Sequence, residues 1–118
     1  MKLQMDNKTN KFAVLISAYT EPKSLYSLVI KLNGMLDADF FIHIDKKVAI
    51  EPFQVGMKNM TNIFFIKERI KVYWGGYSQV LMQFSLIREM FSTNTRYVRV
   101  VNITGTDYPI VSKETLYE

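Results

Sequence analysis

The sequence has no cysteine and a single histidine among its 118 residues. Without cysteine there can be no disulfide framework, no thiolate metal site and no cysteine nucleophile. Such a composition is typical of the reducing cytosol. No apolar run approaches the roughly 20 residues that a membrane-spanning helix needs. We therefore expect a cytoplasmic protein without a transmembrane segment, either free or bound peripherally to the inner face of the membrane.

Two common phosphate-binding motifs are missing as well. Neither Gly-x-Gly-x-x-Gly nor a P-loop occurs in the sequence, which removes the commonest dinucleotide and nucleoside-triphosphate sites. The net charge is +4, but the longest basic run is Lys46-Lys47, so we expect no nucleic-acid partner. A small anionic ligand fits such a scattered positive charge at least as well.

The sequence also lacks a convincing metal site. Its only Asp-x-Asp is Asp37-Ala38-Asp39, which precedes a predicted strand and so lies at the wrong end of the sheet for a ligand site. We interpret it as a helix-to-strand turn. No other set of His, Asp and Glu residues has the spacing of metal ligands. We expect neither a metal nor another cofactor.

Apolar residues, in contrast, make up 48% of the chain, which is enough for a folded core. The first residues are polar and lack the apolar stretch of a signal peptide, so residues 1–11 are predicted to be a flexible leader. Apolar runs with β-branched members predict strands at 12–18, 40–44, 62–66 and 97–103. Residues 12–118 are predicted to form one α/β domain or subdomain.

The segments between these strands carry helical patterns. Glu21-Pro22 opens a first helix, and a short helix is expected after Pro52. A second long helix is predicted to begin with Ser78 as its N-cap, and another to open at Ser112. The buried face of the helix after Ser78 is predicted to consist of Val80, Phe84, Ile87 and Phe91. This alternation predicts an α/β fold, a Rossmann-like parallel sheet of about four strands with flanking helices.

Ligands of such sheets bind at the C-terminal ends of the strands. The predicted strands are followed there by small and polar residues, which include Ala18, Tyr19, Asp45, Lys46, Arg69, Gly105, Thr106 and Asp107. Buried apolar strands must end in polar residues in any case, so this gathering alone is modest support for a site.

The stretch "FIHIDKK" contains the single histidine, His43. It stands in mid-strand between isoleucines, so we favour a structural role in which it hydrogen-bonds a neighbour within the sheet. Asp45 stands at the tip of the strand and has two interpretations. Its carboxylate can accept from a ribose hydroxyl or a base N–H, or it can cap the loop or pair with Lys46 or Lys47.

The stretch "VYWGGYS" combines a glycine pair with aromatic residues just before a predicted helix. Glycine lets a ligand approach the main chain, and a helix N-terminus favours an anion. Trp74, Tyr73 and Tyr77 offer stacking faces. A turn with aromatic core anchors explains the same pattern equally well.

The stretch "ITGTDYP" places Gly105, Asp107 and Pro109 directly after the fourth strand. A turn accounts for each of these residues individually. A turn does not explain why these residues fall on the same edge of the sheet as the polar residues that follow the other three predicted strands.

These blocks together resemble a known family. "FFIHIDKK", "NIFFIKERIKVYWGGYS" and "TGTDYPI", followed by Ser112 and Glu114, are similar to the core-2/I-branching β-1,6-N-acetylglucosaminyltransferase family in their order and separation. That family includes peptide O-xylosyltransferases and many bacterial members. "AYTEP" matches the segment after the family's first strand, with Glu21 in place of the usual Asp. The resemblance covers residues 12–118.

The resemblance implies the N-terminal, nucleotide-binding half of a GT-A-like glycosyltransferase. Such enzymes transfer a sugar from a UDP-sugar, such as UDP-GlcNAc or UDP-xylose, to a hydroxyl of a glycan or another acceptor. The anomeric carbon is inverted, and a carboxylate acts as general base. The family does without a metal-binding Asp-x-Asp, and basic side chains offset the diphosphate charge instead.

Carried over residue by residue, the resemblance gives each block a role. Ala18 and Tyr19 would line the nucleotide pocket, and Asp45, with Lys46 beside it, would face uridine. The border of the donor would consist of Arg69, Trp74, Gly75, Gly76, Tyr77 and Ser78, and Gly105, Thr106 and Asp107 would lie beside the transferred sugar. Thr106 replaces a common Gln and Val111 a common Lys, which bears on the sugar used.

Family members are considerably longer than this chain. Their catalytic carboxylate and the basic residues that bind the diphosphate resemble nothing here and would lie beyond Glu118. No catalytic residue is therefore assigned, and the chain is interpreted as the donor-binding half. The alternative is a non-catalytic α/β module that binds a nucleotide or a protein. An exposed sheet edge would favour a homo-oligomer.

Overall fold

The computed structural model describes residues 11–73 and 75–104. The elements in chain order are β1 (Phe12–Ala18), α1 (Pro22–Met35), β2 (Ala38–Ile44), α2 (Glu51–Gln54), β3 (Ile63–Phe65), α3 (Tyr77–Ser92) and β4 (Arg99–Thr104). Trp74, Gly105, Thr106, Asp107 and the helix expected from Ser112 lie outside the described residues. No helix of the described part has both the length and the apolar character needed to cross a membrane.

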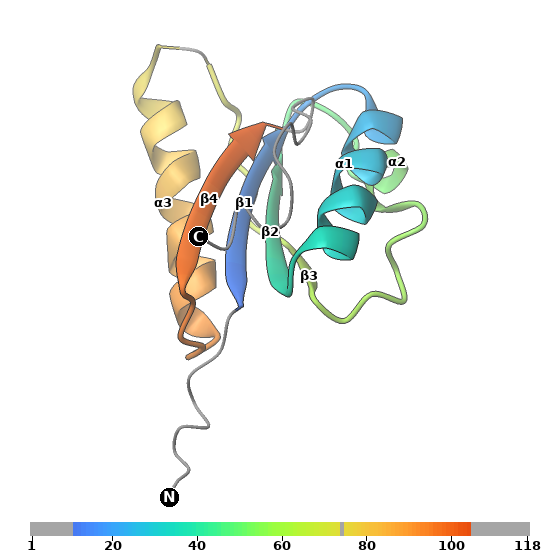
Figure 1. Ribbon diagram of the computed structural model, residues 1–118. Helices are drawn as coiled ribbons and strands as arrows, with labels where there is room; N and C mark the ends of the chain where they lie inside the picture. The colour runs from blue at the N-terminus through green and yellow to red at the C-terminus, as the bar shows by residue number, and fades with distance from the viewer. Residues whose placement is uncertain (1–10, 74, 105–118) are drawn as a thin grey trace, which may run out of the picture.

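The strands form one parallel sheet in the order β3-β2-β1-β4. Ile16 of β1 pairs with Ile42 on one side and with Ile103 on the other. The predicted fold class, a Rossmann-like parallel sheet with flanking helices, is therefore confirmed. Because all four strands run in one direction, their C-terminal ends meet at one edge, as Figure 1 shows.

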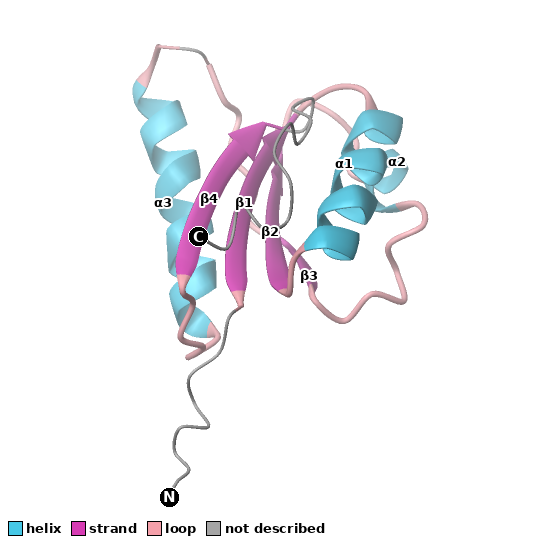
Figure 2. Cartoon of the chain, viewed as in Figure 1, coloured by secondary structure: helices cyan, strands magenta, loops and turns pink. Residues whose placement is uncertain are grey.

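Helices cover both faces of the sheet. Figure 2 shows α1 and α2 on one face and α3 on the other. Val14 and Ile16 belong to the apolar cluster on the α1 side, whereas Ala13 and Leu15 belong to the cluster on the α3 side. Both faces of β1 are thus buried, which explains why this strand is a continuous apolar run with no polar alternation.

α1 follows the predicted pattern. Proline stands in its first turn, and its buried residues are Leu25, Leu28, Val29 and Leu32. The preceding Glu21 has a positive φ of 56°, and its Oε1 accepts a hydrogen bond from Ser24 Oγ at 3.0 Å. The chain leaves the helix at Leu36, whose N–H donates to the Leu32 carbonyl.

α3 differs from its prediction in two respects. It begins at Tyr77 with Gly76 as the N-cap, so Ser78 lies inside the helix and is not the cap. The predicted buried face is also wrong for three of its four residues, because Val80, Phe84 and Phe91 are 47%, 60% and 70% exposed. Ile87, the fourth, is half-buried and packs against the cluster on this side of the sheet. The buried residues are Met82, Ser85, Leu86 and Met90.

A physical reason for the second error lies in the composition of α3. The helix is apolar on two opposite faces, and local periodicity cannot choose between them. Methionine adapts to an uneven surface such as the sheet. Ser85 can lie against the sheet because its hydroxyl donates to the Met82 carbonyl at 2.6 Å, so this buried hydroxyl has a hydrogen-bond partner.

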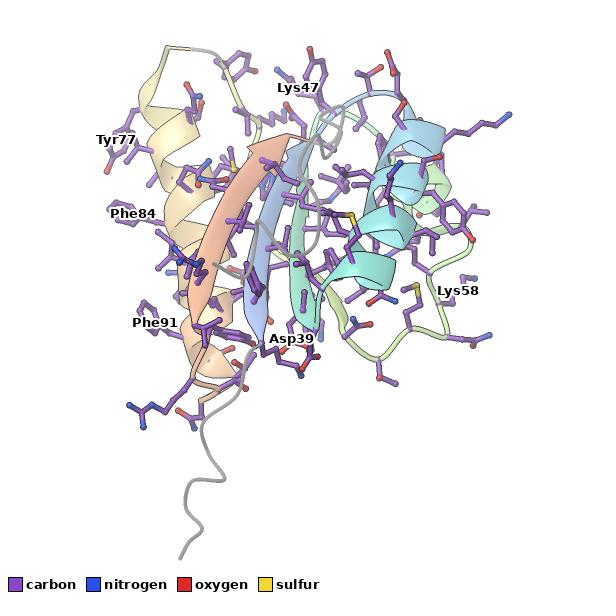
Figure 3. The ribbon with its side chains drawn as sticks, viewed as in Figure 1. Asp39, Lys47, Lys58, Tyr77, Phe84 and Phe91 are labelled. Atoms are coloured by element: carbon purple, nitrogen blue, oxygen red, sulfur yellow. The ribbon has the colours of Figure 1, made fainter. Side chains whose placement is uncertain are left out.

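The N-terminal edge of the sheet holds the Asp-x-Asp sequence. Ala38 and Asp39 belong to β2, so the turn predicted over Asp37-Ala38-Asp39 is shorter than expected. Asp39 Oδ2 accepts from the Tyr97 hydroxyl at 2.7 Å, and Asp39 Oδ1 lies 3.2 Å from Lys11 Nζ. Figure 3 shows Asp39 at the opposite end of the sheet from Lys47, as the prediction required.

Candidate functional site

Small and polar residues meet at the C-terminal edge of the sheet, where β1 and β2 end side by side. The Asp45 N–H donates to the Ala18 carbonyl at 3.0 Å, which holds the two strand ends together. A cavity of about 40 Å³ lies here, lined by Ser17, Ala18, Tyr19, His43, Asp45, Val72 and Met82. A buried water needs roughly 10–15 Å³ on this scale, so the cavity has room for about three waters. It can form only the floor of a site for a larger ligand.

Asp45 connects the end of β2 to the segment that leads into α3. Its Oδ1 accepts from the backbone N–H groups of Lys47 at 2.9 Å and Val72 at 3.3 Å. Its Oδ2 lies 3.5 Å from Lys47 Nζ. The loop-capping interpretation of Asp45 is therefore what the structure shows, and the role toward uridine stays a prediction.

The two neighbouring lysines are used differently. Lys47 Nζ donates to the Val72 carbonyl and lies 4.3 Å from the centre of the Tyr73 ring, so its charge is held by the loop. Lys46 contributes a backbone N–H to the Ile70 carbonyl at 3.1 Å. Its exposed side chain makes no ion pair with any residue that the structure describes. Of the two ammonium groups, that of Lys46 is the one available to a ligand.

Arg69 is anchored at the same edge by main-chain oxygens. Its Nη1 donates to the carbonyls of Asp45 at 3.2 Å and Val48 at 2.9 Å. No carboxylate pairs with it among residues 11–73 and 75–104. Since these bonds use one nitrogen of a guanidinium with five N–H donors, the side chain is held in place and still able to bind an anion.

His43 has the structural role that its sequence context favours. Its Nε2 accepts from the Ile70 N–H at 2.9 Å, so the partner lies in the segment after β3 and not within the sheet as predicted. Burial lowers the pKa of His43 to about 4; the Asp45 charge opposes this shift and the Arg69 charge adds to it. The imidazole is consequently neutral at pH 7 and its Nε2 lone pair is occupied.

The glycine pair before α3 is stabilised by hydrogen bonds within the turn. Gly75 has a φ of 75°, which fits the predicted need for glycine, and its N–H donates to Gln79 Oε1 at 3.2 Å. The Gly76 N–H donates to the Tyr73 carbonyl, and Ser78 Oγ accepts from the Tyr73 N–H at 2.8 Å. These two glycine N–H groups are thus used within the turn, as the turn interpretation predicts, and the ligand-binding role of the stretch stays a prediction.

The exposed tyrosines point in different directions. Tyr19 lines the cavity and is exposed beside it, and Tyr73 stands over Lys47 at the same edge. Tyr77 projects from the outer face of α3, away from the sheet (Figure 3). The structure therefore brings Tyr19 to Asp45 and does not bring Tyr77 there.

Sequence reasoning assigned Tyr73 a stacking role but missed the contacts that the segment Ile70–Tyr73 makes with the end of β2. Ile70 binds His43, Val72 binds Asp45 and lines the cavity, and Tyr73 contacts Lys47. The alternation of Ile70 and Val72 with polar residues was the one signal of an extended segment here. Nothing in the sequence indicated that its N–H groups would face the end of β2.

A second and larger groove lies between the start of α1 and the residues after α2. It has a volume of about 970 Å³ and is lined by Glu21, Pro22, Lys23, Ser24, Tyr26, Ser27, Pro52, Val55 and Gly56. None of the predicted donor-binding residues lines this groove. The cavity at the strand ends is smaller, but the convergent polar groups lie there, and we build the site on it.

The charge of this edge suits an anion. Asp45 is already paired with Lys47, and neither Lys46 nor Arg69 makes an ion pair with a described residue. Over the described residues, no three His, Asp or Glu side chains gather in a way that could hold a metal ion. The expectation that no metal is needed stays a prediction.

Comparison with known proteins identifies one family. A sequence model of the Core-2/I-Branching enzyme family matches residues 12–118. The matched range includes every strand and helix described above and every predicted site residue. No curated protein gives a match to the chain.

Proposed function

The chain belongs to the Core-2/I-Branching enzyme family, and on this premise we propose that it binds the nucleotide part of a UDP-sugar for an inverting glycosyltransferase. Glycosyl transfer itself follows from the family. We further propose that the donor is a UDP-sugar such as UDP-GlcNAc or UDP-xylose, and that the acceptor is a hydroxyl of a glycan or another molecule. The observation that supports it most is that Ala18, Tyr19 and Asp45 line one cavity at the ligand edge of the sheet.

Uridine would lie over this cavity. The small side chain of Ala18 lets a ring approach the end of β1, and the exposed ring of Tyr19 supplies a stacking face. Asp45 uses Oδ1 for two backbone N–H groups, while Oδ2 lies 3.5 Å from Lys47 Nζ and has no other polar partner among the described residues. A carboxylate has about four lone-pair sites, so Oδ2 can accept from a ribose hydroxyl or from the uracil N–H.

The diphosphate would be met by basic side chains. Arg69 is already positioned by two carbonyl oxygens, and a guanidinium so placed binds phosphate oxygens without losing much further side-chain freedom. Lys46 extends from the loop after β2, whose carbonyls anchor Arg69, and adds a second positive charge. In this proposal the two cations offset part of the donor's charge, beside the basic residues expected beyond Glu118, and no metal takes part.

No catalytic base is proposed within this chain. Asp45, the carboxylate that lines the cavity, is committed to the loop contacts just described. We therefore assign donor binding to these residues. The alternative, a non-catalytic module that binds a nucleotide or a protein, shares the same cavity and differs in that no sugar is transferred.

The test is a titration of the 118-residue chain with UDP, followed by thermal unfolding. Binding to the folded state raises the unfolding temperature with ligand concentration, and we expect the same rise with and without a chelator. Lys46→Ala and Tyr19→Ala should weaken the rise. Lys58→Ala, an exposed lysine on a distant loop (Figure 3), is the matched control and should leave it unchanged.

Two results would contradict the proposal. One is an absence of any stabilisation by UDP. The other is an equal stabilisation by pyrophosphate, since the base would then contribute nothing. Because no catalytic base is assigned within this chain, the chain alone is expected to release no sugar from UDP-GlcNAc or UDP-xylose under either hypothesis, so UDP binding and not turnover is the readout.

A further inference from the structure

The outer face of α3 carries a row of exposed apolar side chains. Tyr77, Phe84 and Phe91 are 74%, 60% and 70% exposed, and Figure 3 shows all three projecting away from the sheet. Val80 and Leu81 are exposed between them. We call these five residues the outer α3 face. Exposed apolar side chains gathered on one helix face, here with the exposed Arg88 among them, mark an interaction site in a folded protein.

The opposite face of α3 already packs on the sheet, through Met82, Leu86 and Met90. A helix that is apolar on all sides is normally buried on all sides. α1 provides a partial contrast, because its outward positions include Lys23, Ser27 and Lys31 beside the less exposed Tyr26 (40%) and Ile30 (41%). The two helices occupy equivalent layers of the fold, so the apolar character of the outer α3 face is not a requirement of the fold itself.

The rings on this face are evenly spaced. Tyr77, Phe84 and Phe91 stand seven residues apart, which is the heptad repeat of helices that pair along their length. Seven residues correspond to about 10.5 Å along the axis. A two-fold axis through Phe84 would superimpose the pattern on itself: Phe84 would meet Phe84 of a second copy, and Tyr77 would meet Phe91 of that copy.

We propose that the outer α3 face pairs with the same face of a second copy of this chain, with the two α3 helices antiparallel about a two-fold axis at Phe84. Such a contact is isologous and closes after two copies. The proposal is independent of the proposed function, because the cavity at the strand ends is not part of this face.

The available area agrees with a dimer. A fully buried aromatic side chain removes about 150–250 Å² from water, so the exposed parts of six rings, three from each copy, bury roughly 800 Å². The smallest stable interfaces bury about 1,200 Å² in total. Val80, Leu81 and the polar residues at the rim supply the remainder in both copies.

The charge of α3 argues against a membrane as the occupant. Helices that lie on membranes carry many Lys and Arg residues beside their apolar face. α3 has only Arg88 and Glu89 as charged residues, and their charges cancel. Binding of the outer α3 face to anionic lipid is therefore a competing outcome for the test and not the inference.

The first measurement is the mass of the 118-residue chain in solution across a dilution series. We expect twice 13.8 kDa at high concentration. Phe84→Asp places two like charges on the axis and should raise the dissociation constant at least roughly 100-fold, the effect of losing a central aromatic contact. Val55→Asp makes the same change at a residue that is 68% exposed and away from α3; it should leave the dimer intact.

The absence of native cysteine permits a second, direct test. Phe84→Cys should form a disulfide-linked dimer on mild oxidation, because only a residue on the axis meets its own counterpart within bonding distance. Val55→Cys should remain monomeric in a denaturing gel.

Several outcomes would overturn the proposal. A wild-type chain that stays monomeric at all concentrations would do so, as would a dimer that survives Phe84→Asp. Association that continues beyond two copies would also contradict a closed two-fold contact. So would a monomer that co-sediments with vesicles of anionic phospholipid and loses this binding in Phe84→Asp, since the membrane would then be the occupant.

Discussion

The imidazole of His43 accepts a hydrogen bond from the backbone N–H of Ile70 at 2.9 Å, which connects the middle of the sheet to the segment before α3. Only the neutral ring can accept this bond, since both nitrogens of a charged imidazole are donors. The pKa of His43 is accordingly lowered from 6.5 to about 4, chiefly by burial. The bond therefore makes the fold sensitive to acid.

The first prediction concerns stability between pH 4 and 6.5. Over this range the unfolded chain binds a proton at residue 43 that the folded chain does not, so the free energy of unfolding falls as the pH is lowered. The contribution is fully present above pH 6.5, and its loss on reaching pH 4 amounts to at most about 3 kcal/mol. Urea unfolding measured at several pH values checks this.

The control is His43→Gln, which keeps an acceptor without a titrating group. Its unfolding free energy should depend less on pH than that of the wild type between pH 4 and 6.5. The difference between the two proteins isolates the contribution of His43. Equal pH dependence of both proteins would show that the pKa of His43 is the same in the folded and the unfolded chain.

A second prediction concerns Asp45 as a structural residue. Asp45→Ala leaves the N–H groups of Lys47 and Val72 without their acceptor, and should lower the free energy of unfolding by about 2 kcal/mol. Asp45→Asn keeps one acceptor oxygen and should lower it less. Glu68→Ala, an exposed residue at the same edge, is the control and should change little. Equal effects of the Ala and Asn variants would contradict the loop-capping role.

A third prediction contrasts two glycines. Gly56 has a φ of 84°, and a Cβ there would lie 2.6 Å from the Tyr26 ring, so Gly56→Ala should destabilise the fold by about 1–3 kcal/mol. Gly34 is exposed within α1 and has no atom near the added Cβ. Gly34→Ala should stabilise by about 0.5–1 kcal/mol. Thermal unfolding of both variants checks the opposite signs.

The part played by Tyr26 can be separated from backbone strain. In a Tyr26→Ala background, Gly56→Ala should cost less than in the wild type, because the ring that it meets is gone. The remaining cost would come from the positive φ alone. An unchanged cost would show that the ring moves aside freely.

A fourth prediction concerns the N-terminal edge of the sheet. The Tyr97 hydroxyl donates to Asp39 Oδ2 at 2.7 Å and lies 3.2 Å from Thr93 Oγ1. Tyr97→Phe removes a hydrogen bond to a buried carboxylate and should lower the free energy of unfolding by about 1.5–3 kcal/mol. Tyr77→Phe removes a hydroxyl from an exposed ring and should have no measurable effect. A similar loss in both variants would contradict the role assigned to the Asp39 contact.

Much of the fold could be predicted because the sequence carries it locally. The run that forms β1 is apolar at both even and odd positions, and this requires helices on both sides of the strand. Pro22 and the spacing of Leu25, Leu28 and Leu32 define α1 in the same way. The parallel order of the strands then brought Ala18 and Asp45 to one edge, which is why part of the site could be predicted too.

Other features depended on contacts between distant segments. His43 and Ile70 are 27 residues apart, as are Asp45 and Val72, and no local pattern links them. α3 has two apolar faces, so its own sequence was compatible with either orientation. The sheet selected the face with Met82 and Leu86, and this left Phe84 and Phe91 outside.

The amino-acid sequence by itself determined the strands, α1 and the edge at which polar residues gather, because burial on two faces and helical periodicity act over a few neighbouring residues. The tertiary structure alone decided which face of α3 is buried and which backbone groups Asp45 and His43 bind. These depend on the packing of a helix against a sheet and on the path of a connecting segment, and both are properties of the whole fold.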